Sequence, residues 1–157
     1  MTSVRAERRE DLNAVRLVNE GAFGEPNEAD LVDALRGTVH SVLSFVAVKE
    51  GRVVGHVLFT PVSIGSPGSD SDVLGLGPLA VLPDFQDRGI GSLLVRHGLK
   101  ECLRSGFRVV VVLGSPRYYG RFGFSQANLR GLRCESDVPD EVFVMAELAP
   151  GALGGRT

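Results

Sequence analysis

One stretch of the chain decides the fold that the sequence predicts: Leu79 to Gly91, with the sequence LAVLPDFQDRGIG. It runs from an apolar strand through a short loop and a glycine-containing turn into a helix. The turn places several backbone N–H groups around one concavity, where the positive end of the helix dipole also lies. Such a concavity binds phosphate groups. Gly89 and Gly91 keep side chains out of it, and Arg88 adds a positive charge at its rim.

The strand that leads into this turn is irregular. Val73 to Leu82 is mostly apolar, but Gly75, Gly77 and Pro78 interrupt it. Such interruptions predict that the strand splays away from a neighbour. A splayed strand leaves N–H and C=O groups free to pair with an extended ligand that contains amides. The pantetheine arm of coenzyme A is such a ligand, and its pyrophosphate would then lie on the glycine turn.

The rest of the chain alternates between strands and amphipathic helices. The longest helix presents one apolar stripe, and the run VVVVL is typical of a strand that is covered on both faces. The predicted strands are Ser3–Glu7, Phe45–Lys49, Arg52–Ile64, Val73–Leu82, Arg108–Leu113, Leu129–Cys134 and Glu141–Leu148. The predicted helices are Arg9–Gly21, Glu28–Arg36, Gly89–Ser105 and a short one that Ser115 and Pro116 begin.

Length and composition fit one cytoplasmic domain. The chain has 157 residues, 43% of them hydrophobic, which predicts a single domain over residues 1–149 and a loose tail over 150–157. No apolar run is long enough for a membrane span, and the polar start of the chain lacks the apolar core of a signal peptide. Two cysteines make no disulfide framework, which favours a reducing compartment.

Charge and the placement of the cysteines argue against nucleic-acid binding and against a metal site. The net charge of −2 argues against a nucleic-acid partner, which would require a basic face. Neither Cys102 nor Cys134 belongs to a Cys/His cluster, so no metal site is expected.

Two blocks of the sequence carry a family resemblance. The first is Gln86, Gly89 and Gly91, preceded by an apolar strand that ends in Val-Leu-Pro. The second is YYGRFGF, Tyr118 to Phe124. With one helix and one buried strand between them, the blocks resemble the acetyl-CoA-binding motif and the later tyrosine segment of the GNAT N-acetyltransferases. The resemblance covers roughly Val4 to Leu148, and the stretches Gly55–Phe59 and Leu76–Val81 resemble its YhbS-like bacterial branch in particular.

The resemblance implies a fold and a reaction. The fold is of the α/β (α+β) class: a mixed, mostly antiparallel central sheet opens into a V, with helices on both faces (the acyl-CoA N-acyltransferase fold). The reaction uses acetyl-CoA as cosubstrate. A primary amine of a small molecule or peptide attacks the thioester directly, without an acetyl-enzyme intermediate. Many relatives are dimers, so a homodimer is one expected state.

The resemblance also implies the site residues. Tyr119 would contact the cofactor and give a proton to the departing thiolate. The backbone N–H near Val81 would hold the thioester carbonyl. The pantetheine arm would pair with Leu79, Ala80 and Val81, and the pyrophosphate would lie on Gln86, Asp87, Arg88, Gly89, Ile90, Gly91 and Ser92.

Two positions depart from the family pattern. Asp87 stands where many members have glycine, and its carboxylate would repel a pyrophosphate unless it points to solvent. The strand Leu74–Val81 has no acidic residue, although members often carry a glutamate there as the base. We therefore nominate His56 as the proton acceptor, directly or through water, because the intrinsic pKa of histidine lies near neutrality.

Simpler interpretations remain beside these. Tyr119 is equally typical of a core aromatic residue, and a lone histidine in a strand such as His56 is more often structural. The run from Gly75 to Ala80 matches a dinucleotide fingerprint in its letters, but it is a strand rather than the start of a helix. The carboxylates near the first helices are expected to be solvated or capping charges: Glu20, Glu25 and Glu28.

Two other functions stay open. The chain could be a non-catalytic acetyl-CoA sensor or interaction module, or an acyltransferase that uses a longer acyl-CoA. Tyr119 favours catalysis over sensing, because a sensor needs no acid for a thiolate.

Overall fold

A computed structural model describes residues 2–38, 43–62, 73–126 and 142–148. The chain divides into two compact units: Met1–Thr60 with Gly77–Gly98, and Pro61–Leu76 with Leu99–Thr157. The single domain predicted for residues 1–149 stays a prediction, and the predicted tail lies outside the described residues. No helix in the described part of the chain is both long and apolar enough to cross a membrane.

The first unit contains four neighbouring strands in the order β1, β2, β3 and β4. Their bounds are Thr2–Ala6, Leu43–Lys49, Arg52–Pro61 and Val73–Val81, and β4 reaches this unit with its second half. Both β1 with β2 and β2 with β3 pair antiparallel. Glu50 and Gly51 join β2 to β3 with positive φ angles of 52° and 76°, which suit a tight hairpin turn. The predicted hairpin is therefore confirmed.

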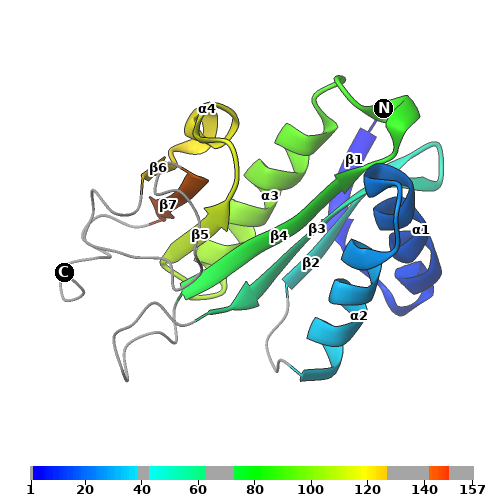
Figure 1. The fold of residues 1–157 in the computed structure, drawn as a ribbon, viewed down its shortest axis with the longest axis horizontal. Helices are drawn as coiled ribbons and strands as arrows, with labels where there is room; N and C mark the ends of the chain where they lie inside the picture. The colour runs from blue at the N-terminus through cyan, green and yellow to red at the C-terminus, as the bar shows by residue number, and fades with distance from the viewer. Residues whose placement is uncertain (1, 39–42, 63–72, 127–141, 149–157) are drawn as a thin grey trace. The chain divides into compact units, whose positions relative to one another are not determined.

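Helices cover both faces of this part of the sheet. On one face α1 (Leu12–Phe23) and α2 (Asn27–Thr38) lie side by side (Figure 1). Val46 and Leu58 of the strands join these helices in one core cluster. Phe59 follows Leu58 and therefore points to the opposite face. There its ring packs on Gly98 of α3 (Ile90–Arg104) so closely that an added Cβ atom would lie 2.4 Å from it.

The second unit contains the first half of β4 together with β5, β6 and β7. There β4 pairs in parallel with β5 (Val109–Leu113), β5 pairs antiparallel with β7 (Phe143–Glu147), and β7 pairs antiparallel with the two-residue β6 (Ser125–Gln126). The first four residues of β5 are buried, as the run of valines predicts. The core of this unit contains Val73, Val109, Val111, Phe143 and Met145.

The irregular strand β4 behaves as its sequence predicts. Its parallel ladder with β5 covers only Val73 to Gly75, although β4 itself continues to Val81. Gly77, just after the ladder ends, has a φ of 151°, which L side chains rarely adopt. The interruptions in the sequence therefore mark the place where regular pairing with β5 ends.

Several boundaries differ from the prediction. The first helix begins at Leu12, because the preceding residues Arg9–Asp11 form a 3-10 turn. The strand β3 ends at Pro61, which is before the predicted Ile64. The short strand β6 has no alternating pattern and was not predicted. The predicted strand Leu129–Cys134 lies outside the described residues.

Candidate active site

The turn between β4 and α3 is fastened to the end of β4 by Gln86. A short 3-10 helix, Pro83–Phe85, follows the strand. The side-chain Nε2 of Gln86 then donates a hydrogen bond of 2.9 Å to the carbonyl oxygen of Val81. This bond closes the loop, so Gln86, the first residue of the motif, has a structural role: it fixes where the next residues lie relative to the strand.

Two residues with left-handed backbone angles direct the chain into α3. Asp87 has a φ of 62° and Gly89 a φ of 80°. A Cβ atom on Gly89 would meet no atom within 4 Å, so glycine suits this position through its backbone angle. Asp87 occupies the same backbone region with a side chain, which aspartate tolerates better than most residues. The glycine common in the family at this point is explained by that backbone angle.

Helix α3 begins at this turn with N–H groups that have no acceptor within the helix. The N–H of Leu93 is bonded to the carbonyl of Gly89 at 3.1 Å, as the first full turn of the helix requires. The N–H groups of Ile90, Gly91 and Ser92 precede it and have no intrahelical acceptor. Together with the helix dipole, they form a favourable environment for an anion.

Positive side chains gather beside the turn around one aromatic ring. Lys49, Arg52 and Arg88 place their charged groups 5.9, 5.7 and 5.7 Å from the centroid of the Phe85 ring. Lys49 and Arg52 flank the β2–β3 hairpin, so they meet Arg88 only in the folded chain. Only Arg88 was recognised from the sequence, because the hairpin lies more than thirty residues earlier.

The strand residues expected to hold the pantetheine arm directly precede the turn. Ala80 is buried, whereas Leu79 and Val81 are half-buried. Their neighbour β3 approaches closely, because a Cβ atom on Gly55 would lie 3.3 Å from the carbonyl oxygen of Ala80. The structure therefore brings Leu79–Val81 and Gln86–Ser92 together within the first unit.

His56 lies at the centre of a buried polar network in the same unit. Its Nε2 is 2.8 Å from Ser44 Oγ, and the Ser44 hydroxyl donates to Glu7 Oε1 at 3.0 Å. Glu7 in turn accepts two hydrogen bonds from Arg36. The Nδ1 of His56 accepts from Asn19 Nδ2 at 3.2 Å. Because the single Ser44 proton goes to Glu7, His56 must be the donor to Ser44, and the neutral Nε2–H tautomer follows.

This environment argues against His56 as the proton acceptor of a reaction near neutral pH. The side chain is fully buried, and burial together with the charge of Arg36 lowers its pKa from 6.5 to about 3. Both ring nitrogens already have partners. We therefore assign His56 a structural role, the alternative that a lone strand histidine suggested.

The buried histidine makes stability depend on pH. Below pH 6.5 the unfolded chain protonates His56, whereas the folded chain resists this until about pH 3. The contribution of His56 to the free energy of unfolding is therefore fully present above pH 6.5, and it is lost progressively as the pH falls. From pH 7 to pH 5 the loss is about 2 kcal/mol. In urea unfolding, we expect the free energy of unfolding to fall more steeply between pH 7 and pH 5 for wild type than for His56→Gln. Parallel pH profiles of the two free energies would contradict this.

Tyr119 belongs to the second unit. It ends α4 (Pro116–Tyr119), which Ser115 caps by accepting the Tyr118 N–H at 3.3 Å, as the Ser-Pro pair predicts. The ring is 9% exposed and packs against Tyr118 and Phe124, with ring centroids 5.0 and 5.6 Å away. Burial raises its pKa to about 12, so the phenol keeps its proton at neutral pH.

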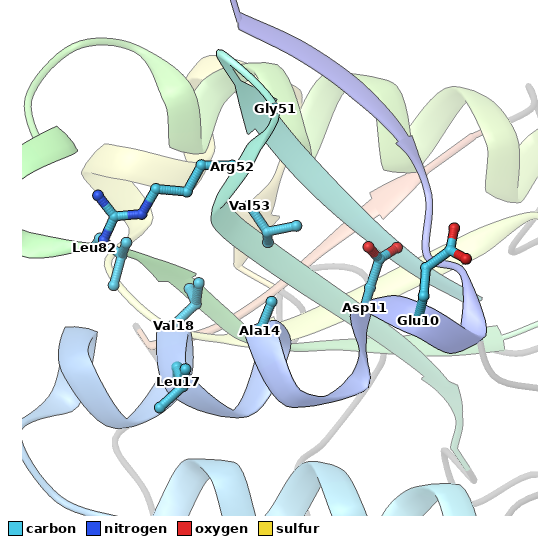
Figure 2. A pocket seen from close by; sticks show the side chains of 9 residues that line it. All are labelled: Glu10, Asp11, Ala14, Leu17, Val18, Gly51, Arg52, Val53 and Leu82. Carbon is cyan, nitrogen blue, oxygen red and sulfur yellow. The ribbon is translucent and has the colours of Figure 1, made fainter.

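A pocket that the sequence did not predict lies on α1. It measures about 450 Å³, and none of the predicted site residues lines it. Figure 2 shows Arg52 and Leu82 at one end and Asp11 and Glu10 at the other. The Asp11 carboxylate is already held by Arg5, which lowers its pKa. Residues of the β2–β3 hairpin and of α1 line the pocket, and these segments meet only in the folded chain.

Comparison with known proteins is consistent with the geometry. A family model described as the acetyltransferase (GNAT) domain matches residues 3–127. The uncharacterized N-acetyltransferase YhbS of Escherichia coli K12 is 38% identical over 137 residues, which are 87% of this chain and 81% of YhbS. The uncharacterized N-acetyltransferase YjhQ of the same organism is 37% identical, over 83% of this chain and 74% of YjhQ.

Solved structures share the fold. The crystal structure of E. coli YhbS in complex with CoA has a TM-score of 0.90 and 34% identity, and the match covers 98% of this chain and 85% of that one. A GNAT acetyltransferase from Brucella melitensis in complex with acetyl-CoA has a TM-score of 0.79 and 36% identity, over 96% and 90% of the two chains. The fold predicted from the sequence, with its mixed open sheet and flanking helices, is thereby confirmed, and the chain belongs to the GNAT acetyltransferase family.

Proposed function

We propose that this protein is an N-acetyltransferase that moves the acetyl group of acetyl-CoA onto a primary amine of a small molecule or peptide. The turn at Gln86–Ser92 carries the proposal, because three features meet there: helix N–H groups without an intrahelical acceptor, two residues with left-handed backbone angles, and a cluster of positive charge. The CoA and acetyl-CoA complexes of the two related structures support this choice of cosubstrate. The expected homodimer stays a prediction.

The proposed reaction assigns each part of the site a task. The pantetheine arm pairs with Leu79–Val81, and the pyrophosphate binds the N–H groups at the start of α3. The backbone N–H near Val81 holds the thioester carbonyl, on which negative charge develops. The amine nitrogen forms a bond to the carbonyl carbon, the C–S bond breaks, and the thiolate takes the proton of Tyr119. Water takes the proton that the amine loses, since His56 is buried and neutral.

A turnover assay tests the proposal. The purified chain is incubated with acetyl-CoA and a panel of polyamines, amino acids, aminoglycosides and peptides, and free thiol is measured. Amine-dependent thiol release is expected for at least one class. Binding of acetyl-CoA in calorimetry without release across the panel would favour the sensor. Faster thiol release from a longer acyl-CoA would favour an acyltransferase that uses a longer acyl chain.

The exposed carboxylate of Asp87 should weaken cofactor binding. Asp87→Asn removes the charge beside the pyrophosphate and keeps a residue that tolerates a φ of 62°. An exposed charge interaction of this kind is worth about 0.2–1 kcal/mol, so acetyl-CoA should bind about 1.4- to fivefold more tightly in calorimetry at low salt. Asp84→Asn, also exposed and three residues earlier, is the matched control. Equal tightening in both variants would mean that only net charge matters.

A further inference from the structure

The pocket on α1 is not used by the proposed reaction. Its volume of about 450 Å³ lies within the range of small-molecule sites. All of its lining residues belong to the first unit, and they come from α1, the turn before it, the β2–β3 hairpin and Leu82. None of them belongs to α2, to Leu79–Val81 or to Gln86–Ser92. The pocket is therefore a separate place from the strand and turn that we assign to acetyl-CoA.

The middle of the pocket is apolar. Ala14 and Val18 lie one turn apart on α1, and Val53 faces them from the hairpin (Figure 2). Leu17 also lines the pocket, and its exposed fraction of 64% is the highest among the large hydrophobic side chains of the described residues. A ligand with an apolar body would remove this surface from water, which favours binding.

One end of the pocket is positively charged. Arg52 lies there, and the ion pairs found within the described ranges do not include it. Lys49 and Arg88 bring two further cations to the Phe85 ring on which the Arg52 guanidinium packs. A guanidinium group presents a planar fork of N–H donors that matches a carboxylate. This end therefore favours an anion, and Arg52 is its partner within the pocket.

The carboxylates at the opposite end are balanced by their own neighbours. Asp11 accepts hydrogen bonds from the Arg5 guanidinium at 2.7 and 3.1 Å and from the Arg8 N–H at 2.7 Å. Glu10 lies 3.8 Å from the Arg8 guanidinium, and both side chains are strongly exposed. The pocket is thus positive at Arg52 and close to neutral at Asp11. From Asp11 to Val18 the chain advances by about 10 Å along α1, which is enough for a short alkyl chain.

We propose that this pocket binds a carboxylic acid with a short apolar chain. The carboxylate pairs with the Arg52 guanidinium, and the chain lies along Leu17, Val18 and Val53. The difference in charge between the two ends sets this orientation. The ligand is neither the acetyl acceptor nor the cofactor, so the site goes beyond the proposed function and does not depend on it.

Thermal unfolding of the full chain tests the site, with sodium hexanoate as the probe. So small a ligand should bind with a Kd on the order of 10 mM. At about 50 mM it should raise Tm by about 2–4 °C above the value in equimolar sodium acetate, which has the charge but no chain. Hexylammonium chloride has the chain but the opposite charge and should give no such rise. An equal rise with hexylammonium would overturn the proposal.

Substitutions in the pocket assign the effect to its residues. Arg52→Gln should remove the rise in Tm. Leu17→Ser should reduce the rise at little cost in stability, because the leucine side chain is mostly exposed. Lys49→Gln is the matched control, since Lys49 belongs to the same cation cluster but does not line the pocket, and it should keep most of the rise. An unchanged rise in Arg52→Gln, or an equal loss in Lys49→Gln, would show that the pocket is not the site.

The turn at the start of α3 would also attract an anion, and Gly91→Glu separates the two places. This substitution should block the turn, but Gly91 does not line the pocket. The rise in Tm with hexanoate should therefore be the same in Gly91→Glu as in wild type. Loss of the rise in that variant would place hexanoate at the cofactor turn and contradict the proposal.

Discussion

Replacing Tyr119 with phenylalanine should lower kcat for acetyl transfer by about 10²–10⁴-fold, the usual loss on removing a positioned general acid. The phenol has a pKa raised to about 12, so it is protonated and able to donate at neutral pH. The substitution removes the hydroxyl alone and keeps the ring that packs against Tyr118 and Phe124. Acetyl-CoA affinity and Tm should change little, because the ring and its packing against Tyr118 and Phe124 are kept.

Tyr118→Phe is the matched control for this experiment. Tyr118 is adjacent, half-buried and stacked by the Arg121 guanidinium 4.4 Å from its ring centroid. Its loss of a hydroxyl should have a milder effect on kcat. Normal turnover of Tyr119→Phe on a confirmed acceptor would remove Tyr119 from the mechanism. A large fall in Tm without a specific fall in kcat would support the alternative in which Tyr119 is only a core aromatic.

Local signals in the sequence predicted most elements of the fold. Hydrophobic periodicity indicated α3, a run of β-branched residues indicated β5, and Glu50-Gly51 indicated the hairpin, and each is confirmed. These elements are specified by residues within one or two turns of each other. The start of α1 was placed wrongly, because the Asp11 carboxylate accepts the Arg8 N–H and the Arg5 guanidinium in a turn that precedes the helix.

The candidate site shows where local signals end. The glycine turn was predictable, since its residues are consecutive and its backbone angles favour glycine. The surroundings of His56 were not predictable, because its partners Asn19 and Ser44 are 37 and 12 residues away. From the sequence the intrinsic pKa of histidine suggested a base. Burial reverses that inference, and only tertiary packing decides burial.

The same distinction applies to charge. Glu28 was expected to be a solvated or capping carboxylate, which is the usual state of glutamate near a helix start. Its Oε1 atom is instead buried without a partner. Lys49 and Arg52 carry no motif, yet the hairpin brings them to Phe85 beside the phosphate-binding turn that we propose. Charge arrangements that bring together distant segments of the chain could therefore not be predicted from the sequence.

Replacing Gly91 with glutamate should weaken acetyl-CoA binding by at least about 100-fold, which corresponds to about 2.7 kcal/mol. Gly91 is the second residue of α3, and its N–H is among those with no intrahelical acceptor. A carboxylate at a helix start interacts favourably with the dipole and with free N–H groups. The new side chain should therefore occupy the place proposed for the pyrophosphate and repel it as well, while the helix itself stays stable.

The design of the Gly91 experiment separates charge from bulk. Gly91→Ala adds one methyl group to a helical position, so it should keep Tm and lose less affinity in calorimetry than Gly91→Glu. Lys100→Glu, nine residues further along α3 and exposed, introduces the same side chain away from the turn and should bind acetyl-CoA as wild type does. If Gly91→Glu also binds like wild type, the pyrophosphate does not lie on this turn. An equal loss in Lys100→Glu would assign the effect to net charge, and the positive end of α3 would then have no special role.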